Sequence, residues 1–321
     1  FKRLADIDVF DLELDTRDPE RFVDTVKALE PTFGAISLKD IRAPEGLEIF
    51  DRLRAELTIP VLHENLYATA IVAMAALINA LDLAEKQIEE IRVVISGAGT
   101  VGLGCARLLC ALGLPKSLLT LYDVDGLIHP GRRDLSSYQR EFARDDAPTN
   151  LAEGLRDADV FLGASVGGVL TQAMIRSMAS FPIVFAMATP EPEIGYAEAR
   201  AARRDVIVGT SSIRDHNAIV DLLSFPYVLR GALDVQAGSI TEGMMLAAAR
   251  ALADLAREEV IDEVSRAYGY ETFTFGPEYL LPKPIDPRIL VQQSTAVAAR
   301  AVDEGVAKRS LATDAYRERL K

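Results

Sequence analysis

The chain has 321 residues, of which 49% are hydrophobic and 26% are charged, and this ordinary globular composition excludes general disorder. At roughly 150 residues per domain, the length predicts about two domains. The formal net charge of −13 argues against nucleic acid as a partner, because binding to a polyanion draws on clustered Lys and Arg.

Cysteine and histidine are sparse, and this limits the chemistry further. Cys105 and Cys110 lie five residues apart in one apolar run, which predicts small core residues in a reducing, cytoplasmic compartment rather than a disulfide. With only three histidines, a multi-His metal site is not expected. The longest apolar run, residues 67–84, carries Asn79 and Asp82, so it predicts a buried helix and no membrane span.

The first part of the chain mixes short apolar runs with acidic turns. Hydrophobic periodicity predicts helices over residues 21–29, 45–57 and 68–83. Short buried strands are predicted over residues 32–38 and 59–63.

Alternating strands and helices dominate the middle of the chain. A helix is predicted over 103–112, and strands are predicted over residues 91–96, 118–124, 159–164, 183–188 and 206–208. The first of these strands is rich in β-branched residues, as buried parallel strands are. This alternation predicts the α/β class with a doubly wound parallel sheet.

The strand pattern fades after about residue 221. Residues 243–255 and 291–306 form Ala-rich runs with helical periodicity. Between them, residues 276–288 carry four prolines, which predicts an extended, irregular connection.

A glycine-rich turn follows the strand at 91–96 and opens the next helix. Gly97, Gly99 and Gly102 have the spacing that permits a tight turn, close approach of a pyrophosphate, and close packing of helix on strand. Thr100 and Val101 then supply backbone N–H groups at the helix start, where phosphates bind. The turn predicts dinucleotide binding, and the alternative is a tight turn in an unrelated α/β protein.

An acidic residue ends the next strand. Asp123 lies 21 residues after Gly102, where a carboxylate accepts hydrogen bonds from the adenosine ribose. A carboxylate there repels a 2′-phosphate, so NAD is expected in preference to NADP. Arg132 and Arg133 follow and are expected to face solvent, and the alternative for Asp123 is a simple turn residue.

Six stretches in chain order form a recognisable set. They are residues 31–41 (PTFGAISLKDI), 59–70 (IPVLHENLYATA), 96–99 (SGAG), 185–193 (FAMATPEPE), 225–234 (FPYVLRGALD) and 281–288 (LPKPIDPR). Together they resemble the malic enzyme family, and the resemblance covers essentially the whole chain. The resemblance implies oxidation of malate with NAD or NADP, decarboxylation of the oxaloacetate to pyruvate, and use of Mg²⁺ or Mn²⁺.

The resemblance also implies a domain arrangement. Residues 1–65 would be the C-terminal part of an α/β substrate and metal domain, and residues 66–321 an NAD-binding domain. Within the latter, a Rossmann-type core spans about 66–224 and helices over 225–321 return to the site. The family's habit and the alanine-faced helices predict a homodimer or larger homo-oligomer.

The residues at the family's metal site depart from its pattern. A Glu-Asp pair and an Asp-Asp pair are expected, whereas this chain has Lys39-Asp40 and Glu64-Asn65. Asp40 and Glu64 retain carboxylates, so a Mg²⁺ or Mn²⁺ site is doubtful. One hypothesis is that the Lys39 ammonium replaces the metal electrostatically. The alternative is that Lys39 points into solvent and the site is inactive.

The usual catalytic groups are not in this chain. The family's catalytic Lys and Tyr would lie before Phe1, and because the chain begins without Met, we expect an N-terminal piece to be missing. Lys39, Tyr67 and Glu64 are the substitute catalytic candidates. A core role is the alternative for Tyr67, and His63 is expected to support the loop.

The substrate end differs from the family as well. Asn65, Thr189, Asn217 and Asp221 are the candidate substrate residues, and the family has amides in place of Thr189 and Asp221. An acid at Asp221 would repel a substrate carboxylate, which points to a 2-hydroxy acid with a different far end. The alternative is a slipped register, with Asp221 as a helix cap or surface acid.

These observations predict an NAD-dependent oxidoreductase that oxidises malate or a related small 2-hydroxy acid, with decarboxylation left open. Ser165 and Asp159 are expected to line the dinucleotide groove, with Thr189 near the nicotinamide. Two alternatives are a non-decarboxylating dehydrogenase of a biosynthetic pathway and a non-catalytic NAD-binding regulatory module.

Overall fold

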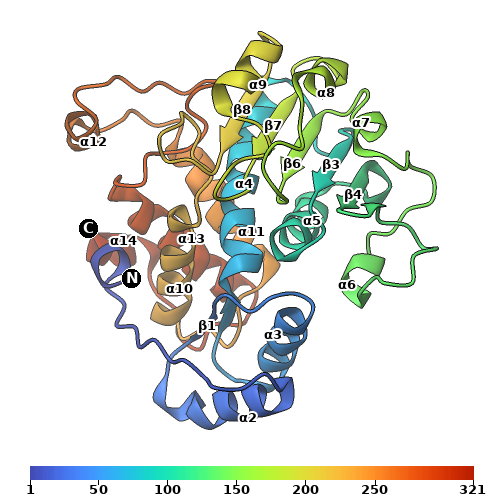
Figure 1. Cartoon of the computed structure of the whole chain (residues 1–321). Helices are drawn as coiled ribbons and strands as arrows, with labels where there is room; N and C mark the ends of the chain where they lie inside the picture. Colours follow the sequence, from blue (N-terminus) through green and yellow to red (C-terminus); the bar gives the residue numbers. More distant parts are fainter.

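Two parallel sheets organise the chain, which a computed structural model describes over residues 1–321 (Figure 1). The smaller sheet pairs β1 (Ile36–Leu38) with β2 (Val61–His63). The larger sheet has the order β5-β4-β3-β6-β7-β8, in which only β5 is antiparallel to its neighbour. Its strands are β3 (Val93–Ser96), β4 (Leu119–Asp123), β5 (Gly126–Leu127), β6 (Val160–Gly163), β7 (Ile183–Ala186) and β8 (Ile207–Thr210). The predicted α/β class is confirmed.

Helices connect and cover these strands. The α-helices are α1 (Lys2–Ala5), α2 (Pro19–Leu29), α3 (Glu45–Glu56), α4 (Glu64–Leu83), α5 (Thr100–Leu112), α6 (Ser137–Arg140), α7 (Leu151–Gly154), α8 (Gln172–Ser177), α9 (Tyr196–Ala202), α10 (Phe225–Asp234), α11 (Glu242–Leu255), α12 (Asp262–Ala267), α13 (Arg288–Asp303) and α14 (Thr313–Leu320). Three 3₁₀ turns are η1 (Glu30–Thr32), η2 (Lys116–Leu118) and η3 (Asp221–Leu223).

The larger sheet is covered on both faces, and its strand side chains alternate between two cores. Val93 and Ile95 belong to a core of 69 residues that includes residues of α4, α5 and α11. Val94 and Phe161 belong to a second core of 15 residues on the side of α8 and α9. This alternation is the period-2 pattern of a strand buried on both faces. The sheet is therefore doubly wound, as predicted.

Helix α4 crosses the centre of the molecule beside α11 (Figure 1). It is long and apolar enough to span a membrane by length and composition, yet 78% of its apolar window is buried inside the fold. The prediction of a buried helix here is confirmed, but the helix begins at Glu64, four residues before the predicted start. Asn65 and Tyr67 consequently lie in its first turn.

The N-terminal region shares its core with the rest of the chain. Leu38 of β1 and Leu62 of β2 belong to the same hydrophobic core as Val93 of β3. At the other end of the region, the Arg230 guanidinium in α10 donates to the Ala5 carbonyl at 2.7 Å, and the two termini lie near each other in Figure 1. The predicted boundary after residue 65 falls in the first turn of α4, and it stays a prediction.

Two local differences from the sequence predictions have simple causes. The strand predicted over 32–38 is shortened to β1, because Pro31 stands in the 3₁₀ turn that precedes it. The region after residue 221 contains α10, α12 and α14 besides the two predicted helices. The proline-rich stretch at 276–288 is irregular, as predicted.

Candidate functional site

The glycine-rich turn adopts a conformation that two of its glycines make possible. Gly97 follows β3 with φ at 109°, and a Cβ there would lie 2.2 Å from the Ala164 carbonyl oxygen. A Cβ on Gly102 would lie 1.8 Å from the Gly97 carbonyl oxygen. A side chain at either position would therefore collide with backbone, so these glycines set the tight turn and the close packing of α5 on the sheet.

The middle glycine faces open space. A Cβ on Gly99 would meet no heavy atom within 4 Å. Helix α5 begins at Thr100, and no side chain caps its first turn, so the N–H groups of Thr100 and Val101 remain available at the edge of the sheet. We call residues 97–102 the phosphate cradle, because uncapped helix N–H groups beside an open glycine fit a pyrophosphate.

Asp123, at the end of β4, does not stand alone. Its two carboxylate oxygens accept hydrogen bonds from the Arg132 guanidinium at 2.7 and 2.8 Å. The Arg132 side chain is 10% exposed and also contacts Asp134 at 2.5 Å. These bonds to Asp134 and Asp123 raise the pKa of Arg132 above its usual value. The expectation that Arg132 faces solvent was wrong, whereas Arg133 is exposed.

A buried glutamate joins the ends of β6 and β7. The Glu193 carboxylate, fully buried, accepts from the Ser165 N–H at 2.8 Å and from the Ala188 N–H at 3.0 Å. The Ser165 hydroxyl lies 3.1 Å from the Ser96 hydroxyl at the end of β3. Ser165 and the exposed Thr189 thus lie at the same sheet edge as the cradle, where ligands bind in such folds.

Sequence reasoning missed the role of Glu193. One signal was available in the sequence, namely the glycine at position 163, which ends β6. In the structure, a Cβ on Gly163 would lie 2.3 Å from the Glu193 carboxyl carbon. A glycine at the last position of a buried strand indicates the close approach of another group.

Two expected site residues are occupied elsewhere. Asp159 lies just before β6, at the opposite edge of the sheet, where it binds Lys86 at 2.7 Å and the Arg92 N–H at 2.8 Å. Asn217 is fully buried, donates to the carbonyls of Val208 and Pro277, and accepts from the Leu280 N–H. The predictions that Asp159 lines the groove and that Asn217 contacts substrate were therefore wrong.

The end of β1 meets the first turn of α4. The Lys39 ammonium lies 3.0 Å from the Glu64 carboxylate, and the Glu64 side chain is only 6% exposed. Asp40 and Asn65 bind each other, since the Asn65 carbonyl oxygen accepts from the Asp40 N–H at 2.9 Å and its amide donates to the Asp40 carboxylate at 3.3 Å. We call these four residues, together with Asp221, the Lys39 cluster.

Asp221 belongs to this cluster through its charge. It begins η3, which packs against α4. The hydrogen bond from Lys39 to Glu64 raises the pKa of the lysine, and the charges of Asp40 and Asp221 raise it further. Lys39 is therefore a protonated donor rather than a base. The candidate substrate residues Asn65 and Asp221 lie at this one place in the fold.

Tyr67 and His63 are core residues. Both side chains are fully buried, and both rings pack edge-on against Phe50 at 5.9 Å. Burial raises the pKa of the Tyr67 phenol and lowers that of His63 to about 4. The structure thus places Tyr67 in the core, the alternative that the sequence left open, and the catalytic role of Tyr67 stays a prediction.

The cluster and the cradle are connected through adjacent helix starts. A Cβ on Gly104 in α5 would lie 1.8 Å from the Leu66 carbonyl oxygen in α4, so the N-terminal parts of the two helices touch. The Ser224 hydroxyl, just after η3, donates to the Ala68 carbonyl at 2.7 Å. Backbone contacts to the start of α4 thus hold both η3 and α5 beside the Lys39 cluster.

The donor set does not fit a divalent cation. No group of three or more His, Cys, Asp or Glu side chains converges anywhere in the chain. Glu64 is paired with Lys39, and Asp40 is paired with Asn65. Mg²⁺ and Mn²⁺ need several free oxygen ligands, and this cluster does not offer them.

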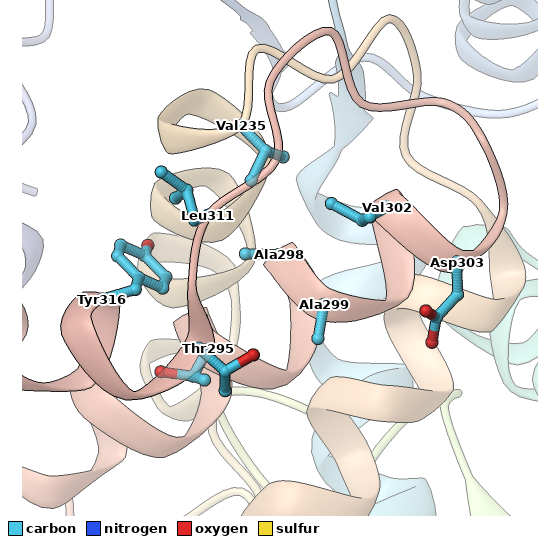
Figure 2. A pocket seen from close by; sticks show the side chains of 9 residues that line it. Val235, Thr295, Ala298, Ala299, Val302, Asp303, Leu311 and Tyr316 are labelled. Carbon is cyan, nitrogen blue, oxygen red and sulfur yellow. The ribbon is translucent and has the colours of Figure 1, made fainter.

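Two of the hollows in the molecule bear on the extent of the candidate site, and neither is lined by the cradle. One, of about 530 Å³, is bordered by Asp40, Arg17 and Phe22, and it adjoins the Lys39 cluster. The other, of about 110 Å³, lies between α13 and the C-terminal segment. Figure 2 shows Val235, Ala298 and Leu311 lining this second hollow. No residue of the cradle or the Lys39 cluster lines it, so it is separate from the candidate site.

The strand order and the cradle define a dinucleotide-binding domain of the Rossmann class, with its crevice at the switch point between β3 and β6, from which the chain continues to β4 on one side and to β7 on the other. The family described as "Malic enzyme, NAD binding domain" matches residues 66–267. The chain belongs to the malic enzyme family.

Relatives and solved structures agree with this assignment. The chain is 45% identical to an "NADP-dependent malic enzyme" of Haemophilus influenzae over 100% of this chain and 43% of the relative. It is 44% identical to an "NAD-dependent malic enzyme" of Rhizobium meliloti, over 100% of this chain and 42% of the relative. The crystal structure of malic enzyme from Pyrococcus horikoshii superposes with a TM-score of 0.90 at 33% identity, covering 99% of this chain and 72% of that one.

Two facts follow from these relatives. The chain spans less than half the length of the two curated relatives. Their names include both NADP and NAD at nearly equal identity, so the expected preference for NAD has no support from them.

Proposed function

We propose that the chain is the nucleotide-binding part of an oxidoreductase that oxidises malate or a related small 2-hydroxy acid with NAD or NADP. The phosphate cradle is the observation that carries this proposal, because Gly99 leaves the space that a pyrophosphate needs. Membership of the malic enzyme family supports the reaction class. The relatives described above are all named malic enzymes, and none of them supports the two alternative functions.

Each part of the sheet edge has a role in this proposal. The nicotinamide, when bound, accepts a hydride from the substrate. The N–H groups at the start of α5 bind the pyrophosphate, and the Asp123–Arg132 pair faces the adenosine ribose. Ser165 and Thr189, after β6 and β7, flank the nicotinamide half of the crevice.

The Lys39 cluster is the proposed substrate end. The ammonium of Lys39 donates hydrogen bonds to a substrate oxygen, and Glu64 holds it in place. Asp221 is an acid, so it disfavours a second carboxylate beside it. The substrate class that fits best is therefore a 2-hydroxy acid whose far end is not a carboxylate at this position.

The test has two stages on the purified protein. Calorimetry with NAD and with NADP should show saturable binding to the cradle. Formation of NADH or NADPH is then followed spectroscopically with malate and with 2-hydroxy acids that have neutral far ends. Absence of nucleotide binding at millimolar concentration contradicts the proposal, and binding without turnover of any 2-hydroxy acid contradicts its catalytic part.

The assembly and cellular location stay predictions. We propose a cytoplasmic homodimer or larger homo-oligomer, on the basis of the alanine-faced helices and the unpaired cysteines. Light scattering after size-exclusion chromatography measures the oligomeric state directly.

A further inference from the structure

The Lys39 cluster contains a buried acid with one charged partner. Glu64 is 6% exposed, and its only ion pair is with Lys39, at 3.0 Å. A carboxylate withdrawn from water needs a compensating charge or hydrogen bond. Lys39 supplies that charge from a different element, since it follows β1 whereas Glu64 begins α4.

Three acids act on the same lysine, since the charges of Asp40, Glu64 and Asp221 all raise its pKa. Of these acids, only Glu64 forms an ion pair within 4.0 Å, and its partner is Lys39. In the malic enzyme family, to which this chain is similar throughout, the resemblance places a divalent cation at this position. The fold thus places the Lys39 ammonium, which is part of the chain, where the resemblance implies a divalent cation that binds from solution.

The ammonium also has donors to spare. It carries three N–H groups, and Glu64 accepts from one of them. The Lys39 side chain is 62% exposed, so the remaining donors are accessible from outside the cluster. Asp40 is held by Asn65 and does not compete for the same place as Glu64.

We propose that Lys39 takes the place of the divalent cation in this site, neutralising Glu64 and offering its remaining N–H groups to an oxygen of the substrate. The second half of this statement rests on the proposed function, and the first half does not. A metal ion would have to displace the ammonium from Glu64 and would meet a like charge at close range, so the native cluster excludes it.

Titration with MnCl₂ alone tests the first half, with binding measured by calorimetry and free Mn²⁺ measured by electron paramagnetic resonance. The three proteins are the native chain, Lys39→Glu, which supplies a further carboxylate, and Lys39→Gln, which removes the ammonium without adding one. The native protein should show no saturable site. Lys39→Glu should bind Mn²⁺ at least about tenfold more tightly than the native protein, with Lys39→Gln between the two.

A second measurement covers the case in which Lys39→Glu folds poorly, since its new carboxylate lies beside Glu64. Added Mn²⁺ should raise the Tm of Lys39→Glu and leave that of the native protein unchanged. Native binding as tight as that of Lys39→Glu overturns the proposal. A Lys39→Glu protein that gains neither Mn²⁺ affinity nor a Tm shift also overturns it, because the cluster would then not have the geometry of a cation site.

Nucleotide binding separates this proposal from the proposed function. Calorimetry with NAD and NADP on all three proteins should give equal affinities, because the cradle lies in the turn from β3 into α5 rather than in the cluster. If none of the three binds nucleotide, the proposed function fails while the Mn²⁺ result still stands. With nucleotide bound, Lys39→Gln should raise the KM for a 2-hydroxy acid by about tenfold, which one lost charge-assisted hydrogen bond explains. An unchanged KM overturns the second half.

Discussion

Asp123 accepts two hydrogen bonds from Arg132, and this pair closes the carboxyl end of β4 beside the phosphate cradle. A bare carboxylate at this position would repel the 2′-phosphate of NADP. Here a guanidinium, the group that best binds a phosphate, lies against that carboxylate. The pair therefore contains a carboxylate, which favours NAD, and a guanidinium, which favours NADP. The balance between these two groups decides which nucleotide binds more tightly.

Breaking the pair from either side should shift this balance in opposite directions. Asp123→Ser removes the carboxylate that repels a 2′-phosphate and leaves Arg132 paired with Asp134 and Asp125 only, so the ratio of NADP affinity to NAD affinity should rise by about tenfold or more. Arg132→Ala leaves Asp123 unpaired and should lower the same ratio. Calorimetric titration of each variant with both nucleotides measures the shift.

Arg133→Ala is the matched control, because Arg133 is adjacent in sequence but exposed. It should leave the ratio unchanged. A shift for Arg133→Ala as large as that for Arg132→Ala would mean that general positive charge, rather than the Asp123 pair, sets nucleotide choice.

Substitutions at two glycines of the cradle should separate nucleotide binding from the stability of the fold. Gly99→Ala places a methyl group where no atom lies within 4 Å, at an ordinary φ of −88°. Its Tm should be close to native, whereas its affinity for NAD and NADP should fall by about tenfold or more, because the methyl group occupies the pyrophosphate space.

Gly102→Ala provides the contrast. Its Cβ would lie 1.8 Å from a carbonyl oxygen, so it should lower the free energy of unfolding by several kcal/mol, on the order of the cost of overpacking a core. Denaturation in urea and calorimetry on both variants check this. Native nucleotide affinity in Gly99→Ala would show that the cradle does not hold the pyrophosphate.

The cradle was predictable from sequence because its chemistry is local. Gly97, Gly99 and Gly102 are fixed by the turn itself, and the strand and helix on either side follow from short-range periodicity. The sheet and its two covered faces follow in the same way. What could not be predicted depends on side chains that meet only in the folded chain.

Arg132 and Asn217 illustrate this limit. The Asp123–Arg132 pair requires the chain to turn back after β5, and nothing local to Arg132 shows that it does so. Asn217 was expected to contact the substrate, but its three partners come from β8 and the irregular stretch after α12. Asp159 was a different kind of error, since a residue at the start of a parallel strand lies at the edge opposite the site.

Asn217 should consequently affect stability rather than substrate binding. Asn217→Ala leaves the carbonyls of Val208 and Pro277 and the N–H of Leu280 without partners, so the free energy of unfolding should fall by about 2 to 4 kcal/mol. Urea denaturation measures this loss, and nucleotide affinity at low temperature should stay native.

Thr189→Ala is the comparison, because Thr189 is exposed at the sheet edge. Its free energy of unfolding should change by less than about 0.5 kcal/mol, whereas substrate or nucleotide affinity should fall. If Asn217→Ala keeps native stability and loses substrate affinity, the assignment of Asn217 to the core is wrong.

His63 should make the fold sensitive to mild acid. Its ring is fully buried with both nitrogens unpaired, and burial lowers its pKa from about 6.5 to about 4. Above pH 7 the ring is neutral in both folded and unfolded chains, so it contributes no pH dependence. As the pH falls below 6.5, the His63 ring binds a proton in the unfolded chain but stays neutral in the folded chain. Between pH 7.5 and 5 this should lower the free energy of unfolding by about 2 kcal/mol.

His63→Leu isolates this effect from the other titrating groups. The variant retains an apolar side chain against Phe50 but has no ring to protonate, so the carboxylates common to both proteins cancel in the difference. Urea denaturation at several pH values should show native stability falling relative to that of His63→Leu as the pH drops. The difference in the free energy of unfolding between the native protein and His63→Leu could instead stay constant from pH 7.5 to 5. That result would mean that His63 is protonated in the folded protein, either because the fold opens around it or because a partner accepts its hydrogen bond. The core position of His63 and its neighbour Tyr67 would then have to be reconsidered, because a protonated imidazole cannot stay buried without a hydrogen-bond acceptor.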